Sequence, residues 1–231
     1  MKRRLVFIIG SLGLALSACA PAPPPKVEPP KVTTTVPTSA TTTVPSAPAT
    51  PPTTVPGPPV PIMGSAVYSA AELVAWYNSK NKVPADGSCA TVAALASNYI
   101  SEGASENVRG DLAFIQAMIE TGWLKHSERV PASWCNYAGI GAVDSGTGAN
   151  VFPSALIGVR AQIQHLRAYA DRTTTCSNFT HPNESPRCHL VSPKGKSPTW
   201  NQMGNGNWAT DPAYGSKVIT LLANLKAFAG H

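Results

Sequence analysis

A stretch rich in proline and threonine, Ala20 to Pro61, limits what this chain of 231 residues can fold into. It repeats Thr-Thr-Val-Pro three times, contains no aromatic residue and shows neither helical nor strand periodicity. Such a segment has too little apolar surface to fold and is expected to stay extended and solvated. We therefore predict a linker over 19–64, which at about 3.1 Å per residue could reach on the order of 120 Å, and a folded domain over 65–231.

The residues before this linker are typical of an export signal. Basic residues 2–4 precede an apolar run, Leu5 to Leu16, that is too short to be a stable membrane anchor. The next residues, Leu16-Ser17-Ala18-Cys19, resemble the lipobox of bacterial lipoproteins, whose cysteine is lipidated and becomes the mature N-terminus. The resemblance implies a signal peptide over 1–18 and a lipid anchor on Cys19 at the outer face of the cytoplasmic membrane. An ordinary secretory signal with a chance cysteine is the alternative.

The positive charge of the chain, formally +6, is unevenly distributed. The predicted signal peptide carries three unpaired cations, whereas the predicted domain has 13 basic and 11 acidic residues. The domain is therefore nearly neutral, and we predict no nucleic-acid partner because its net charge gives no reason to expect one.

The cysteines that follow the linker are even in number: Cys89, Cys135, Cys176 and Cys188. In an exported chain this indicates disulfides, and we favour Cys89 with Cys135 and Cys176 with Cys188. The second pair would close a short polar loop. The alternative is a zinc site of Cys176 and Cys188 with His181 and His189, but this spacing fits no common zinc motif. We predict no metal and no cofactor.

Apolar periodicity predicts an α+β domain that is mostly helical. Helices are expected over 70–80, after the capping box of Ser69 and Glu72, and over 90–101. A third helix is expected from a cap at Ser105 to a stop at Gly122, and two more begin at Ser154 and at Asp211-Pro212. The glycine-rich segment 136–152 predicts a small hairpin or an irregular lobe.

Glu120 is the residue that the third predicted helix singles out. It falls about 100° from the centre of the apolar stripe, and its helical neighbours Ala113 and Ala117 are small. The negative end of the helix dipole disfavours its ionisation, so the carboxyl group can stay protonated as a general acid requires. On position alone, a surface glutamate at a helix end is the commoner outcome.

Four segments in order resemble the glucosaminidase family, the bacterial endo-β-N-acetylglucosaminidases that hydrolyse cell walls. They are a helix ending in Glu120-Thr121-Gly122, the Asn-x-x-Gly-Ile-Gly segment 136–141, the helix segment 158–166 and the closing segment 208–215. Together they span about residues 70–228. The resemblance implies a lysozyme-like fold and cleavage of the β-1,4 bond on the reducing side of N-acetylglucosamine in the glycan strands of peptidoglycan.

The resemblance also implies roles for individual residues. Glu120 becomes the general acid, Tyr214 a cleft residue, and Asn136 and Tyr137 residues of a substrate-binding lobe. Trp123 could stack on a sugar ring or pack in the core.

Glycosidases usually need a second carboxylate. Our candidates are Asp144, which also suits a turn, and then Glu128. The N-acetyl group of the substrate is a third possibility.

Other functions compete with this interpretation. A cell-wall cysteine peptidase would use Cys89 as a thiolate near a helix start, with His126 or His165 as the base. A peptidoglycan-binding lipoprotein would keep the fold without activity. A lytic transglycosylase would share the single acid and leave anhydro ends.

Overall fold

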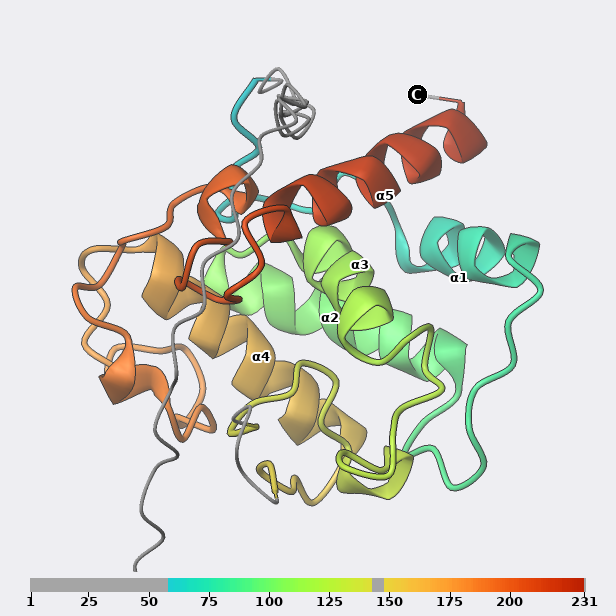
Figure 1. The fold of residues 1–231 in the computed structure, drawn as a ribbon, viewed down its shortest axis with the longest axis horizontal. Helices are drawn as coiled ribbons and strands as arrows, with labels where there is room; N and C mark the ends of the chain where they lie inside the picture. The colour runs from blue at the N-terminus through green and yellow to red at the C-terminus, as the bar shows by residue number, and fades with distance from the viewer. Residues whose placement is uncertain (1–57, 143–147, 231) are drawn as a thin grey trace, which may run out of the picture. The chain divides into compact units, whose positions relative to one another are not determined.

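A computed structural model describes residues 58–142 and 148–230 (Figure 1). Its α-helices are α1 (Ala70–Ser79), α2 (Val92–Glu106), α3 (Gly110–Glu120), α4 (Ala155–Ala170) and α5 (Tyr214–Ala229). Three short 3-10 turns are η1 (Ala132–Trp134), η2 (Cys188–Leu190) and η3 (Trp200–Gln202). The prediction of a mostly helical domain is confirmed. No helix in the described part is long and apolar enough to cross a membrane.

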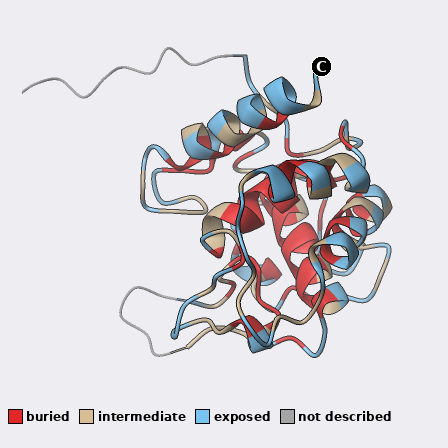
Figure 2. Ribbon diagram, turned by 90° about the vertical axis from the view of Figure 1, so that its right-hand side faces the viewer, coloured by how far each residue is buried: buried red, intermediate tan, exposed pale blue. Residues whose placement is uncertain are grey.

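Helix α3 forms the centre of the domain. Every residue from Gly110 to Met118 is buried, and α2, α4 and α5 pack around it (Figures 1 and 2). Helices α2 and α3 approach closely because Gly110 has no side chain, and a Cβ there would overlap the carbonyl oxygen of Tyr99. The last turn of α3 thus extends from a rigid core, with Glu120 as its final residue.

Two buried ion pairs fix α4 against α2. The guanidinium of Arg160 donates to both carboxylate oxygens of Glu102 at 2.8 and 2.9 Å, and Arg167 donates to Glu106 at 2.6 Å. Both glutamates are buried. Because removing one partner of a buried pair leaves an uncompensated charge, these contacts hold α4 in one position relative to α2.

The capping residues explain which helix boundaries were predicted correctly. Ser69 and Ser154 cap α1 and α4 as expected, accepting from the backbone N–H groups of Glu72 and Ile157. The cap assigned to Ser105 is wrong, because α2 continues through it and ends where Asn107 adopts a left-handed conformation with φ of 52°. Helix α5 begins at Tyr214, a little after the Asp211-Pro212 start that we predicted.

The segment 136–152 forms an irregular lobe, and its described residues contain no strand. The backbone N–H of Asn150 donates to the carbonyl of Ile140 at 2.8 Å, and that of Phe152 donates to the carbonyl of Trp134 at 2.9 Å. The two arms of the lobe therefore pair at separate points. Of the two forms that we predicted, the irregular one is present in the residues described.

Part of the predicted linker belongs to the fold. Ile62 is fully buried, its backbone N–H donates to Pro198, and its carbonyl accepts from Arg109. Gly64 donates to the carbonyl of Asn107 at 2.8 Å. Residues at the end of the predicted linker therefore pack on the domain.

Both predicted disulfides are present. Cys89 and Cys135 join the start of α2 to the root of the lobe, with Cα atoms 5.6 Å apart. Cys176 and Cys188 close the polar loop after α4, with Cα atoms 5.9 Å apart. Their sulfurs are consumed in these bonds. This contradicts both the zinc alternative and the thiolate that a cysteine peptidase would need.

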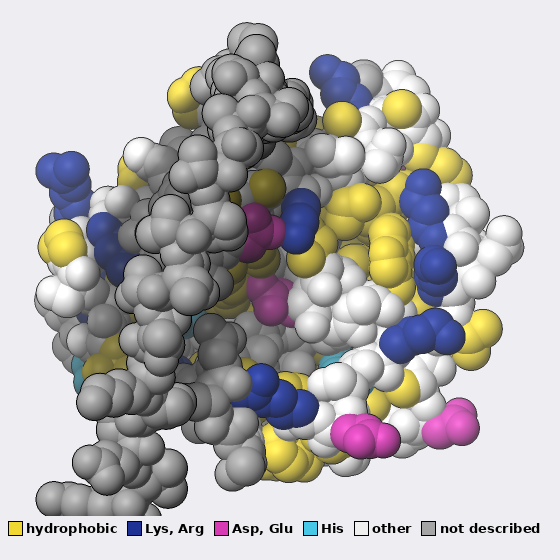
Figure 3. All heavy atoms as spheres, in the orientation of Figure 1, with side chains coloured by type: hydrophobic (Ala, Val, Ile, Leu, Met, Phe, Trp, Pro, Cys, Tyr) yellow, Lys and Arg dark blue, Asp and Glu magenta, His cyan; other side chains and the backbone are white. Residues whose placement is uncertain are grey.

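Both basic and acidic side chains are visible on the face seen in Figure 3, with several basic ones along its right-hand side. This distribution agrees with the near balance of charges in the domain.

Candidate active site

Glu120 lies where two cavities meet. The larger cavity has a volume of about 540 Å³ and lies toward α4, α5 and segment 207–210. The smaller cavity, about 260 Å³, lies toward His126 and Ser127. Glu120 and Gly139 line both. A linear ligand that filled both cavities would therefore pass directly over the Glu120 carboxyl group.

A tight turn after Glu120 redirects the chain. The hydroxyl of Thr121 donates to the carbonyl of Ala117 at 2.6 Å and accepts from the N–H of Leu124 at 2.9 Å. Gly122, Trp123 and Leu124 all have positive φ, which is costly for the two residues that are not glycine. The threonine and glycine that follow the acid thus end α3 abruptly and leave Glu120 at the cavity surface.

The two oxygens of Glu120 have different surroundings. Oε1 accepts from the indole Nε1 of Trp208 at 2.8 Å and from the hydroxyl of Tyr214. Oε2 faces Gly139, where an added Cβ would lie 3.6 Å away. Burial raises the pKa of Glu120, and the two donors partly oppose that shift. Since Oε1 already accepts two hydrogen bonds, the acid proton belongs on Oε2, which borders the cavities.

A chain of buried side chains orients the Tyr214 donor. Gln162 Nε2 donates to the carbonyl of Ala113 at 3.1 Å and to Gln116 Oε1 at 2.8 Å, while its Oε1 accepts from Tyr99. Gln116 Nε2 then donates to the hydroxyl oxygen of Tyr214 at 2.9 Å. The Ala113 carbonyl can only accept, so it fixes the direction of every bond in the chain. The Tyr214 proton therefore points to Glu120.

An aromatic wall borders the larger cavity. The rings of His165, Tyr169 and Trp208 pack with centroids 5.3 to 5.6 Å apart. Burial, together with the nearby cations of Arg187, Lys194 and Lys196, lowers the pKa of His165 to about 4. His165 is consequently neutral near pH 7. The wall offers flat, largely apolar surfaces of the kind that pack against sugar rings.

Asn136 organises the lobe from within. Its Nδ2 donates to the carbonyls of Ile140 and Asn150 at 2.9 and 2.8 Å, and its Oδ1 accepts from the N–H of Ile140 at 3.0 Å. It lines the smaller cavity, but these internal bonds engage both ends of its amide. These bonds indicate that Asn136 positions the lobe and holds Gly139 opposite Glu120, while direct contact of Asn136 with a substrate stays a prediction.

The structure places two predicted aromatic site residues away from both cavities. Tyr137 is buried, its ring packs against His126, and burial raises its pKa to about 12. Trp123 packs on Trp76 with centroids 5.1 Å apart, and its carbonyl accepts from Tyr77. The left-handed turn after α3 directs Trp123 toward α1. Neither residue lines either cavity, so the described geometry gives no support to a sugar-binding role for them, and Trp123 takes the core-packing alternative.

The second carboxylate is not among the cavity residues that the structure describes. Glu128 is exposed and lines neither cavity. Asp144 lies outside the described residues. Of the described residues that line the two cavities, Glu120 alone carries a carboxyl group.

Sequence reasoning missed several residues that build the site. Trp208 opens the closing segment, yet only Tyr214 of that segment was given a role. Gln116 and Gln162 are fully buried amides on otherwise apolar helix faces. A polar residue one turn before a candidate acid, on the central helix, is the signal that could have identified Gln116.

Comparison with known proteins agrees with this geometry. A family model described as glucosaminidase, mannosyl-glycoprotein endo-β-N-acetylglucosaminidase, matches residues 96–227. The chain is also 37% identical over 131 residues to an uncharacterized protein of Borreliella burgdorferi, a match that covers 57% of this chain and 61% of the relative. No solved structure matches the chain. The matched region contains α3, the lobe, α4 and nearly all of α5, and on this match the chain belongs to the glucosaminidase family.

Proposed function

We propose that the domain hydrolyses the β-1,4 bond on the reducing side of N-acetylglucosamine in peptidoglycan strands, with Glu120 as the general acid. The observation that carries this proposal is the asymmetry of the Glu120 carboxyl group. One oxygen is held by Trp208 and Tyr214, and the other borders both cavities beside Gly139.

In the proposed reaction a glycan strand lies across Glu120 and occupies both cavities. The proton on Oε2 passes to the glycosidic oxygen as the bond between that oxygen and the anomeric carbon breaks. Glu120 is then a carboxylate, and the donors at Oε1 stabilise its new charge. Water completes the reaction at the anomeric carbon, and Glu120 recovers a proton from it.

The second group of the reaction is proposed to be either Asp144, as the base that activates water, or the acetamido oxygen of the substrate, as the group that attacks the anomeric carbon. An acetamido group that attacks the anomeric carbon leads to retained configuration after hydrolysis. A carboxylate base that activates water on the opposite face leads to inversion. Proton NMR of the first product separates these outcomes. Loss of activity in Asp144→Asn together with inversion would favour Asp144.

The test of the proposal is digestion of purified peptidoglycan by residues 20–231. New reducing ends on N-acetylglucosamine are expected, and Glu120→Gln should lower their rate of formation by about 10²- to 10⁴-fold. Glu128→Gln, an exposed carboxyl outside both cavities, is the matched control. Ends on N-acetylmuramic acid or anhydro ends would reassign the bond or the reaction. Binding without any new ends would favour the non-catalytic lipoprotein.

The proposed location is the outer face of the cytoplasmic membrane, with the linker extending the domain into the cell wall. It rests on the export signal and the lipobox-like residues that end at Cys19. Cells that express Cys19→Ser should lose acyl labelling of the protein and its sedimentation with membranes. Unchanged sedimentation of this variant would contradict the lipid anchor.

A further inference from the structure

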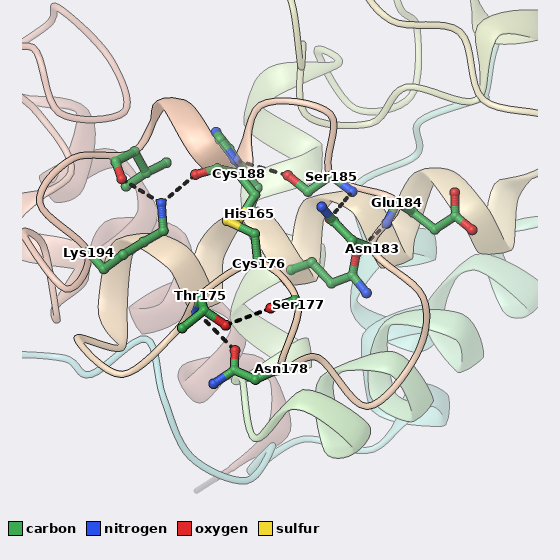
Figure 4. Close-up of a disulfide and its surroundings, with 12 residues drawn as sticks. His165, Thr175, Cys176, Ser177, Asn178, Asn183, Glu184, Ser185, Cys188 and Lys194 are labelled. Atoms are coloured by element: carbon green, nitrogen blue, oxygen red, sulfur yellow. Dashed lines mark hydrogen bonds between the residues drawn. A yellow bond between two sulfur atoms is a disulfide. The ribbon is translucent and has the colours of Figure 1, made fainter.

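The disulfide between Cys176 and Cys188 closes a loop that follows α4 (Figure 4). Arg187, the residue before the second cysteine, lines the larger cavity together with Glu120 and the aromatic wall. Neither the family resemblance nor the proposed reaction gives this arginine a role. Its place in the cavity requires an explanation of its own.

The loop is anchored to helices at several points, so the backbone of Arg187 is held in place. Gln164 of α4 accepts from the N–H of Glu184 at 2.7 Å and donates to the carbonyl of Pro182 at 3.0 Å. The hydroxyl of Ser185 lies 3.2 Å from Nδ1 of His165, as Figure 4 shows. Glu106 of α2 accepts from the N–H of Thr180 at 2.9 Å. These contacts connect the loop directly to the wall of the larger cavity.

The charge of Arg187 is not neutralised within the part of the chain that the structure describes. Arg109, Arg160 and Arg167 each form an ion pair with a carboxylate, whereas Arg187 has none among the described residues. Its side chain is only partly exposed. A partly desolvated guanidinium without a carboxylate partner gains most from an anionic ligand.

Two further cations lie beside the same wall. The ammonium of Lys196 lies 5.1 Å from the ring centroid of Tyr169, and that of Lys194 donates to the carbonyl of Cys188 at 2.7 Å. Both act with Arg187 in lowering the pKa of His165. Three cations therefore lie near His165 on this side of the larger cavity, and of the described residues that line the cavity only Glu120 carries a carboxyl group.

We propose that Arg187 binds a carboxylate carried by the muramyl residues of the strand, a role that rests on the proposed function. In an alternating strand cut after N-acetylglucosamine, a muramyl residue lies within two sugars of the cut on either side. Its carboxylate is that of the lactyl group, where the stem peptide is absent, or that of the stem peptide itself. The planar guanidinium suits both, since it can form two parallel hydrogen bonds with one carboxylate.

The experiment measures binding, so that it does not depend on cleavage. Calorimetry on Glu120→Gln protein compares three ligands of equal length: stem-bearing strands, stem-free strands and oligomers of N-acetylglucosamine. We define the preference as the ratio of the Kd for the uncharged oligomer to the Kd for each strand. This ratio is expected to exceed one for strands that carry a carboxylate. Arg187→Ala should reduce this preference about five- to thirtyfold, and Arg187→Lys by less.

Arg172→Ala removes an exposed arginine outside the cavities and is the matched control. Circular dichroism and thermal unfolding confirm that each variant is folded. Loss of preference for stem-free strands alone assigns the lactyl carboxylate, and loss for stem-bearing strands alone assigns the stem peptide. Loss for both shows that Arg187 binds whichever carboxylate the strand carries.

A preference that survives Arg187→Ala, or that Arg172→Ala reduces equally, overturns the inference. Selective binding without any cleavage by the native protein would contradict the proposed hydrolase and leave the role of Arg187 standing. Failure of every ligand to bind would contradict both.

Discussion

The two cavities beside Glu120 lie between a helical wall and a lobe wall, and these two walls fix their residues by different means. On the helical wall, Glu120 is held by side chains from α5 and segment 207–210, and a buried hydrogen-bonded chain continues behind it to Tyr99 on α2. On the lobe wall, Gly139 is held by backbone hydrogen bonds and by one buried side chain, Asn136. The helical wall thus depends on many side chains, and the lobe wall on few.

This difference follows from what each wall contributes. The helical wall must orient a carboxyl group and determine which of its oxygens carries the proton. The lobe must leave space, because Gly139, with φ of 60°, presents no side chain to Oε2 of Glu120. Its root packs on α4 because Gly158 has no Cβ to clash with the carbonyl of Cys135. Precise chemistry is therefore carried by regular helices, and access by an irregular segment.

The largest expected effect is on the lobe, through its disulfide. Replacing Cys89 and Cys135 with alanine should cost about 4 kcal/mol of unfolding free energy, because the bond closes a long loop. The corresponding Cys176 and Cys188 double variant should cost about 3 kcal/mol. The sequence separations are 46 and 12 residues. Urea unfolding measures both, and a larger loss for the shorter loop would contradict the ranking.

The next effect tests whether one amide holds the lobe. Asn136→Ala should lower the unfolding free energy by about 3 kcal/mol, because buried carbonyls and an N–H lose their partners. Asn178→Ala is the matched control: Asn178 also bonds to backbone groups, of Thr173 and Thr175, but is exposed. Its loss should stay below about 1 kcal/mol. Equal losses in the two variants would show that burial of Asn136 is not decisive.

The helices were largely predictable because their information is local. Ser69 and Ser154 each precede an apolar pattern of helical period, and both cap the helix that follows. Ser105 carries the same local signal but lies inside α2, because Asn107 adopts the left-handed conformation that ends the helix. Whether an asparagine does so depends on how α2 and α3 pack. The sequence pattern alone does not contain that information.

The site was predictable only in part, because its contacts connect distant parts of the chain. Glu120 could be identified from its helix and from the resemblance, but Trp208 and Tyr214 reach it across 88 and 94 residues. The apolar periodicity of a sequence does not indicate a contact between such distant residues. The two alternatives for Trp123 could not be separated for a related reason, since the positive φ angles after α3 turn the chain and place the ring against Trp76.

On the helical wall, Tyr214→Phe should reduce kcat about thirtyfold, or about 2 kcal/mol, through loss of a hydrogen bond to the carboxylate that forms in the reaction. The Tyr214 donor opposes the raised pKa of Glu120, so its removal raises that pKa further. Because protonated Glu120 is the active form in the proposed reaction, the alkaline limb of the pH–rate profile should move to higher pH. Tyr77→Phe removes a hydroxyl that bonds to Trp123 instead, and the limb should stay in place.

The smallest expected effect is on the free energy of unfolding, which the burial of Glu120 in the helical wall lowers at neutral pH. Burial raises the pKa of Glu120 in the folded state, so the protein loses stability as pH rises from the pKa of the unfolded chain through that of the folded one. Glu120→Gln removes this loss and should raise the unfolding free energy by about 1 kcal/mol at neutral pH. The gain should vanish below about pH 4, where the carboxyl is protonated in both states. Chemical unfolding at both pH values, with Glu128→Gln as the control for a lost charge, measures it. If the gain in unfolding free energy persists at low pH, it arises from packing, and the charge of Glu120 does not destabilise the folded protein.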